Sequence, residues 1–460
     1  MNFSSLARLF VCFCLFTLVS FQTRAQSAFI AGEPIEIGEM VNGLPSYDAA
    51  SPGHQRGPIV AATDRGFVVI WNDDQFQVDG MPALGGVFLN PDGEERLPFF
   101  VGVPLAPGIV HPGGAVEWQG HVYISWYAWP SDSARTSIGL TVIDAETGNL
   151  VNSTILSESP ESEDWYALSP VATDRGILLP EMQFHSLLAR FVSDSSLAGL
   201  EAAVSIVDYP GYEDVDIGET HYFAEDIRCV VVGDVGLIAW IEASSIKSGA
   251  SETSVNYAVV AHRLDLSNPA EITLLGEKMV INDDLWGRFD LLVLEDAFLI
   301  IQKEKLTVDS PMNFYATEIP AEPAPMRDRG WIFQNDFWAS SIRAMAFAGG
   351  VVIAANESVP VPDENRSIPT LHLTLLDQNL AVQVPQTAVI ASAPLDFELV
   401  PREDSLMIVG SAYTELEDRS RIIGHLVTVS EDAKDAGHSP GCQTIATADR
   451  DESILALLLP

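Results

Sequence analysis

The sequence is short of cysteine and of basic side chains. Its 460 residues include 4 cysteines, and 24 lysines and arginines stand against 64 aspartates and glutamates, which gives a formal charge of −40. A surface this negative repels nucleic-acid phosphates and anionic lipid headgroups. The composition therefore argues against a nucleic-acid partner and against binding to a membrane surface.

Long apolar runs are missing after the N-terminus, where a single run extends from Leu9 to about Phe21. Arg8 precedes this run, and Thr23-Arg24-Ala25 follows it. A basic start, a short apolar core and small residues at the cleavage position are typical of a secretory signal peptide, and the run is too short to span a bilayer comfortably. We therefore predict a signal peptide at residues 1–25, a secreted or periplasmic location, and a mature protein with no membrane span.

Cleavage after Ala25 would leave only Cys229 and Cys442 in the mature chain. An oxidising compartment permits a disulfide between them. Cys229 lies inside the apolar stretch Ile227–Val232, however, where a buried free thiol is ordinary. The sequence is compatible with both states.

An internal repeat is the strongest structural signal in the chain. Pro58–Trp71 reads as two apolar strands joined by a turn at Asp64-Arg65-Gly66, and Pro170–Leu179 repeats this plan. The turn position recurs with steps of 53 to 61 residues at Gly66, Gly120, Gly176, Gly236, Ala297, Gly350 and Ser405. Glycine suits a hairpin turn that needs a positive φ, and a preceding aspartate can supply the turn at Ala297 and Ser405. The repeat indicates several copies of one structural unit.

Each unit reads as four short antiparallel strands. In the first unit these are Ile59–Ala62, Phe67–Trp71, Gly86–Leu89 and Arg96–Val101. Similar sets continue to Val429, and long helical periodicities are absent. We predict an all-β fold in which residues 26–433 form a seven-bladed β-propeller of four-stranded antiparallel blades and residues 434–460 form a C-terminal tail.

The seventh unit lacks a fourth strand, because the chain becomes polar after Val429. The unused segment Pro34–Met40 can take this place, so that an N-terminal strand closes the ring. Trp71, Trp126 and Trp240 fall near the ends of second strands, and we interpret them as packing between blades.

With these features the chain resembles the bacterial secreted seven-bladed β-propellers. The resemblance covers roughly residues 30–430 and rests on the repeated Pro-x-Val-Ala-x-x-Asp-Arg-Gly type of unit and on the turn Asn90-Pro-Asp-Gly93. It implies an architecture and no particular activity, because propellers serve as enzymes, lectins and scaffolds. The Ser-x-Asp-x-Gly-x-x-Trp box of sialidases and the Asp-x-Asp-x-Asp-Gly calcium loop of integrin-type repeats are absent.

Two functional hypotheses follow from the residues expected at the mouth of the channel. In a carbohydrate-active enzyme, either a polysaccharide lyase or a glycoside hydrolase, His111 or His221 would be the general base. Tyr222 or Tyr166 would then act as the acid, and Arg288 would clamp an acidic sugar.

The favoured hypothesis is an exported binding or assembly module that recognises a glycan or protein partner and breaks no bond. Its ligand contacts would come from Trp129, Glu181, His185, Glu225 and Asp290. We expect this module to be a monomer.

No resident cofactor is expected, although Ca²⁺ is possible. Asp73, Asp74 and Asp79 lie in one predicted loop and could offer hard oxygen ligands. The loop lacks the spacing and the glycine pivot of a calcium loop, so the favoured interpretation is a solvated acidic loop.

Overall fold

The computed structural model describes residues 29–39, 55–73, 77–78, 81–103, 108–130, 136–159, 166–183, 185–198, 200, 202–210, 215–217, 219–248, 251–268, 271–282, 288–304, 312–335, 339–360, 367–391, 397–414 and 419–430. The predicted signal peptide and C-terminal tail lie outside these ranges.

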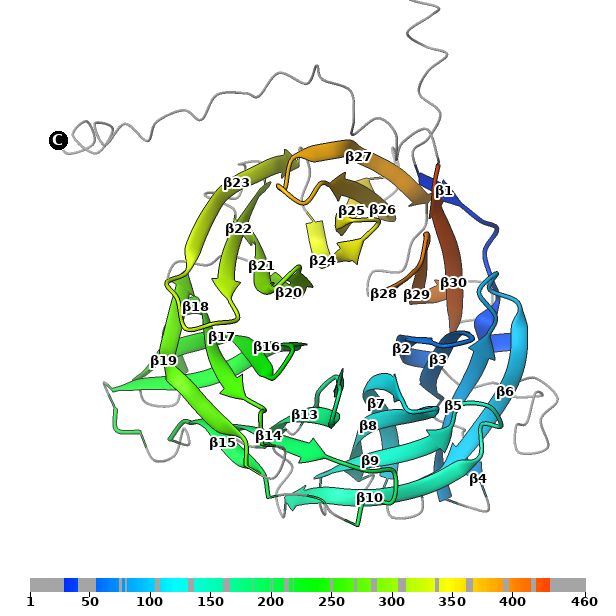
Figure 1. Ribbon diagram of the computed structural model, residues 1–460, viewed down its shortest axis with the longest axis horizontal. Coiled ribbons are helices and arrows are strands. Elements are labelled where there is room, and N and C mark those ends of the chain that lie inside the picture. Colours follow the sequence, from blue (N-terminus) through cyan, green and yellow to red (C-terminus); the bar gives the residue numbers. More distant parts are fainter. Residues whose placement is uncertain are drawn as a thin grey trace, which may run out of the picture.

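Seven antiparallel sheets form a ring around a central channel, and we number them blades 1 to 7 in chain order (Figure 1). The strands next to the channel are β2 (Gln55–Thr63), β7 (Gly108–Trp118), β12 (Val171–Thr173), β16 (Thr220–Val232), β20 (Phe289–Leu294), β24 (Ala339–Phe347) and β28 (Phe397–Arg402). The second strands are β3 (Gly66–Asp73), β8 (His121–Pro130), β13 (Gly176–Gln183), β17 (Val235–Ser248), β21 (Ala297–Glu304), β25 (Gly350–Pro360) and β29 (Ser405–Thr414).

The third strands are β5 (Met81–Leu89), β9 (Thr136–Asp144), β14 (Ser186–Val192), β18 (Ser251–Asp265), β22 (Met312–Pro320), β26 (Ser367–Leu376) and β30 (Arg419–Val429). The outermost strands are β6 (Glu95–Gly102), β10 (Leu150–Ser159), β15 (Val204–Asp208), β19 (Thr273–Asn282), β23 (Arg327–Asn335), β27 (Val382–Ala391) and β1 (Phe29–Ala31). The short strands β4 (Gln77–Val78) and β11 (Tyr166–Ala167) extend blades 1 and 3.

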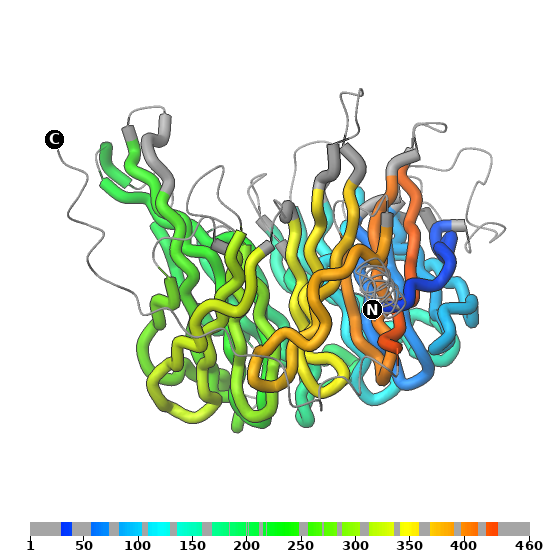
Figure 2. Tube along the Cα trace, turned by 90° about the horizontal axis from the view of Figure 1, so that it is seen from above, coloured from blue at the N-terminus to red at the C-terminus, as the bar shows by residue number. Residues whose placement is uncertain are grey.

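This arrangement confirms the predicted all-β, seven-bladed propeller. The one helix in the described ranges is the 3-10 helix η1 (Ile37–Glu39), and none of the described segments forms a helix long and apolar enough to cross a bilayer. Tight turns join the first and second strands at one end of the ring, which we call the lower face. The first strands begin at the opposite, upper face, and the long strands β17 and β18 of blade 4 rise above their neighbours there (Figure 2).

An N-terminal strand closes the ring, as expected, but the predicted strand was wrong. Phe29 of β1 pairs with Val429 of β30. Of the predicted strand Pro34–Met40, the described residues 34–39 form an isolated bridge from Ile35 to Gly424 and then the helix η1. Ile35 and Ile37 pack into the apolar cluster between blades 7 and 1. Ile35 and Ile37 are two residues apart, and a half-buried strand also buries every second side chain. The sequence pattern is therefore the same for this segment and for a strand.

The core consists of apolar clusters that lie between successive blades, with one principal cluster at each of the seven boundaries. Trp71 packs between blades 7 and 1, Trp126 between blades 1 and 2, and Trp240 between blades 3 and 4. The prediction that these tryptophans pack between blades is confirmed.

The glycine that opens several second strands is explained by a close backbone approach. A Cβ atom on Gly66 would lie 2.0 Å from Leu89 O, and one on Gly350 would lie 2.0 Å from Leu376 O. In blade 2 the equivalent residue is His121, and in blade 4 it is Val235, so the predicted positions Gly120 and Gly236 were each displaced by one residue.

The turns of blades 5 and 7 contain no glycine, and the residues that take up the positive φ are Glu295 and Glu403. The aspartates that follow them, which were predicted to take this role, occupy the second turn position, next to the strand that leaves the turn.

The arginine of the repeated Asp-Arg-Gly turn reaches the next blade. Arg65 pairs with Glu146 at 3.0 Å, and Arg175 pairs with Asp234 at 3.0 Å. In blade 7 an arginine two residues earlier in the hairpin, Arg402 at the end of β28, reaches blade 1 and donates from Nη2 to Asp64 O at 3.1 Å. Each exposed pair contributes little stability, about 0–1 kcal/mol, but together they link blades along the lower face.

We predict that deleting residues 26–41 removes most of the stability of the fold. The deletion removes the β1–β30 pairing and the buried side chains of Phe29 and Ile37. Burying two such side chains contributes about 3–6 kcal/mol, which is comparable to the total stability of many proteins. Urea unfolding measures the loss. A truncated protein that unfolds cooperatively at an unchanged midpoint would contradict the observed ring closure.

We predict that Gly66→Ala lowers the free energy of unfolding by about 2–4 kcal/mol, because the residue has a φ of 145° and its added Cβ meets a backbone carbonyl. The control is Gly120→Ala, where φ is 74° but no atom lies within 4 Å of the new Cβ. The control should lose about 1 kcal/mol. Equal losses in the two variants, measured by thermal unfolding, would show that the carbonyl contact is unimportant.

Candidate functional site

The central channel contains a cavity of about 480 Å³. Its walls come from the innermost strands of blades 4 to 7, and residues 113, 168, 169 and 180 of blades 2 and 3 complete it. A cavity of this size lies within the range that small-molecule ligands occupy in proteins.

One level of the channel is defined by the register of the inner strands. This level is the position four residues before the last residue of the first strand that is paired at the turn. In blades 1, 2, 4, 5, 6 and 7 the residue at this position pairs with the second strand, and in blade 3 the same count gives Ser169. The residues at this level, in blade order, are Ile59, Gly114, Ser169, Arg228, Asp290, Arg343 and Glu398. Blades 4 to 7 thus present alternating positive and negative side chains, and blades 1 to 3 present small or apolar ones.

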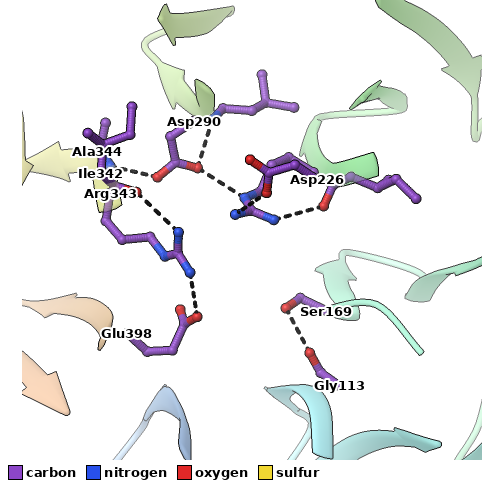
Figure 3. Close-up of polar contacts among 11 residues, drawn as sticks. Gly113, Ser169, Asp226, Asp290, Ile342, Arg343, Ala344 and Glu398 are labelled. Atoms are coloured by element: carbon purple, nitrogen blue, oxygen red, sulfur yellow. Dashed lines mark hydrogen bonds and ion pairs between the residues drawn. The ribbon is translucent and has the colours of Figure 1, made fainter. Parts of the chain in front are cut away.

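The charged side chains contact one another across blade boundaries (Figure 3). Arg228 Nη2 lies 2.7 Å from Asp226 Oδ1, and Arg228 Nε lies 3.4 Å from Asp290 Oδ1. Arg343 Nη2 lies 2.8 Å from Glu398 Oε1. Arg228 therefore joins blades 4 and 5, and Arg343 joins blades 6 and 7.

Asp290 is buried and accepts backbone hydrogen bonds from two blades. Its Oδ1 accepts from Leu291 N at 2.9 Å, and its Oδ2 accepts from Ala344 N at 2.6 Å. Burial raises the pKa of this carboxyl, and Arg228, Arg343 and the two backbone donors counteract the rise. Glu398 is more accessible, with 38% of its side chain exposed, so it is the carboxylate of this level that a ligand in the channel can reach most easily.

Asp226 lies in a β-bulge, where the pairing of β16 with β17 shifts between Glu225 and Arg228. Its φ is 47°, a backbone conformation that residues other than glycine rarely adopt. The bulge turns the Asp226 carboxylate toward Arg228, and Glu225 stays exposed on the same segment. The bulge thus fixes the direction of a charged side chain at the channel wall.

Lys303 of β21 lies close enough to Asp226 and Arg288 to interact with them electrostatically. Only 3% of the residue is exposed. Its pKa is lowered to about 8, mainly by burial and also by the positive charge of Arg288, while Asp226 acts in the opposite direction. A lysine in this state releases its proton in a mildly alkaline range.

His111 lies near the upper end of β7 and contacts Tyr127 and Asn72. Its ring stacks on Tyr127, with centroids 5.1 Å apart and planes inclined by 16°. Asn72 Nδ2 lies 3.1 Å from His111 Nδ1 and donates to Val110 O at 3.0 Å. Burial raises the pKa of the Tyr127 phenol, which therefore stays protonated at neutral pH. Tyr127, which was not among the predicted acids, is thus in contact with His111, while the side chain of the predicted acid Tyr166 lies outside the described set.

A second aromatic group lies where blades 3 and 4 meet. Tyr222 is 38% exposed, and its ring stacks on Tyr209 with centroids 6.2 Å apart. Tyr209 is held in place because its hydroxyl accepts from Trp240 Nε1 at 3.0 Å and donates to Glu242 Oε2 at 2.5 Å. His221 is 5% exposed and lies edge-on to His185, with centroids 5.7 Å apart.

The other predicted site residues are dispersed. Glu181 is fully buried and accepts from Arg190 Nε at 2.8 Å and from Gln183 Nε2 at 2.7 Å, so it belongs to the interior of blade 3. Glu225 and Arg288 are exposed. The side chains of Trp129 and Tyr166 lie outside the described set.

The sequence analysis missed Arg228, Glu398 and Lys303. The first two could have been found by counting seven residues back from the start of each second strand, because that count reaches the channel level in every blade. Lys303 has no such signal, since its burial depends on neighbouring blades.

The described residues contain no group of three or more His, Cys, Asp or Glu side chains that could hold a metal ion. Asp74 and Asp79 lie outside these residues, and so does the side chain of Asp73. Cys229 has no disulfide partner among the described residues, and as a thiol its pKa is raised to about 12 by burial, so that it is protonated at neutral pH. Cys442 lies outside the described residues, so the buried thiol and the disulfide both stay predictions.

Comparisons with known proteins find similarity of fold. No protein-family model and no curated protein matches the chain. Similar solved structures include the GH93 α-L-arabinofuranosidase of Fusarium graminearum, with 11% identity, coverage of 87% of this chain and 99% of that chain, and a TM-score of 0.44. The polysaccharide lyase Uly1 has 9% identity, the same coverages and a TM-score of 0.46. The α-L-arabinanase of Penicillium chrysogenum has 9% identity, coverage of 71% and 99%, and a TM-score of 0.42. Because these identities are 9–11% and the TM-scores are below 0.5, the comparisons assign no activity to this chain.

We predict that the stability of the wild type relative to a Lys303→Met variant increases between about pH 8 and pH 10. The folded-state pKa of Lys303 is about 8 and the reference value is 10.5, so the unfolded chain binds more protons in this range. Raising the pH therefore favours the folded wild type, by up to about 3 kcal/mol in total. Urea unfolding of both proteins at several pH values measures the difference. If the stability difference between the two proteins does not change with pH, the pKa of Lys303 is not lowered in the folded protein.

Proposed function

We propose that this protein binds a carbohydrate in the channel and at its upper mouth. The observation that supports this most directly is the asymmetry of the channel level, where four inner strands present alternating charges and three present small or apolar residues. A sugar has a polar edge of hydroxyl groups and less polar ring faces. Charged side chains can bind the edge through hydrogen bonds, while small residues leave room for the ring.

The cost of the charged half supports a ligand role. Burying ion pairs is expensive and often gives no net stability, even when the pairs are well formed. Blades 1 to 3 do without charges at the same level, so the propeller itself does not require them. The partly exposed Glu398 and its partner Arg343 are the groups we assign to hydroxyl recognition.

The upper mouth adds an aromatic surface. Tyr222 presents an exposed ring that is backed by Tyr209, which is itself anchored by Trp240 and Glu242. A rigid aromatic ring with one accessible face binds an apolar ring face at low entropic cost. We also propose, on the basis of the predicted signal peptide, that this binding takes place outside the cytoplasm.

Cleavage of the bound carbohydrate is a second candidate function, and the contact between His111 and Tyr127 favours it. The protonated phenol of Tyr127 can act as the acid toward a glycosidic linkage, and His111 can hydrogen-bond the same linkage. In this reading the channel binds one part of the chain and the His111–Tyr127 pair acts on the next linkage.

A panel of neutral, acidic and amino-sugar oligosaccharides tests both functions. Tyr222→Ala should weaken binding about tenfold, because it removes the exposed ring without disturbing the buried core. The control is Trp331→Ala, which removes an exposed aromatic residue on the outer strand β23, and it should leave affinity unchanged. Calorimetry measures the affinities, and product release from the same mixtures reports cleavage.

Absence of binding to every oligosaccharide, or equal loss in the two variants, would overturn the proposal. Binding without product would leave recognition as the function and reject cleavage.

A further inference from the structure

The hydrogen bonds of Asn72 determine which nitrogen of His111 carries the proton. Asn72 is 3% exposed, and its Nδ2 faces both Val110 O and His111 Nδ1. Val110 O is a carbonyl oxygen and can only accept. The side-chain atom of Asn72 opposite it must therefore be the NH₂ group, because the reversed amide would place two oxygens against each other.

The second hydrogen of this NH₂ group is directed to His111 Nδ1, which must then accept. A neutral imidazole has one N–H and one lone pair, so the proton of His111 resides on Nε2. A protonated ring would set an Nδ1–H against the Asn72 NH₂ group and is disfavoured by this contact.

We propose that Asn72 is a positioning residue that keeps His111 neutral and makes it a hydrogen-bond donor, through Nε2–H, to an acceptor oxygen of the bound carbohydrate. The oxygen can belong to a hydroxyl, ring ether, glycosidic linkage or carboxylate. This inference rests on the proposed function for the identity of the ligand, but the protonation state does not depend on it. It also replaces the earlier hypothesis of His111 as a general base, because the lone pair that a base needs is occupied by Asn72.

The stacking partner agrees with this role. Tyr127 packs face to face with the imidazole, so it restricts rotation of the ring while Asn72 restricts its tautomer. Asn72 comes from blade 1, and both His111 and Tyr127 come from blade 2. The packing between these two blades therefore determines the direction of the donor.

Nitrogen-15 NMR of the imidazole rings in the full-length protein at pH 8 tests the tautomer directly. We expect the Nε2–H form for His111. The molecule contains an internal reference: His121 Nδ1 lies 3.0 Å from Gln119 O, a carbonyl acceptor, so His121 should show the opposite, Nδ1–H form.

In Asn72→Asp, a carboxylate would accept from Nδ1–H, and His111 should change to the Nδ1–H form while His121 stays unchanged. An Nδ1–H form of His111 in the wild type would overturn the inference, whether or not the variant folds.

Two substitutions of His111 test the donor in binding. The amide NH₂ of His111→Gln can replace Nε2–H but cannot act as a base, so this variant should bind the best oligosaccharide of the panel within about threefold of the wild type. His111→Ala should bind about tenfold more weakly, because it loses one hydrogen bond to the ligand. If His111→Gln and His111→Ala lose affinity equally, the donor role is wrong even where the tautomer is as expected. If the wild type binds no oligosaccharide, the proposed function fails, and the NMR result still decides the role of Asn72.

Discussion

A blade of this protein can bury its apolar side chains only against the faces of its two neighbours. The principal apolar clusters lie at the seven boundaries between blades, and the large tryptophans are placed there too. Each blade is therefore stable only as part of the ring, and the ring needs the short strand β1 to complete blade 7. The same packing holds the seven inner strands in register, so that equivalent residues reach the same level of the channel.

The charges in the channel are part of this packing. Asp290 accepts a backbone hydrogen bond from Ala344, and Arg343 pairs with Glu398, so the boundaries between blades 5 and 6 and between blades 6 and 7 each contain a polar link at the channel wall. On the lower face, Arg65, Arg175 and Arg402 link other blades near the turns. Polar contacts thus supplement apolar packing at both depths.

Much of the architecture could be predicted from the sequence, because the turn before each second strand leaves a regular trace of glycine, aspartate and glutamate. The closing strand was misplaced, since alternation of Ile35 and Ile37 does not distinguish a strand from a segment that packs against Gly424. The site was predicted less well. His111 and Asp290 were identified by residue type, but their roles depend on Asn72 and Ala344, which come from neighbouring blades. Contacts between blades have no fixed spacing along the chain, so one sequence cannot reveal them.

The pairing of Phe29–Ala31 with Val427–Val429 joins the earliest described strand of the chain to the last. In a chain made from its N-terminus onward, β1 waits without a partner until β30 has been synthesised, whereas β28, β29 and β30 pair as consecutive hairpins. The β1–β30 pairing forms slowly, because the entropy of closing a very long loop is lost before the contacts that compensate for it form. The partner of β30 is nevertheless already present when β30 appears, so its exposed edge is covered by β1 of the same molecule rather than by another chain. Because the short strand β1 comes first in the chain, ring closure is slow, but the edge of β30 is protected against aggregation.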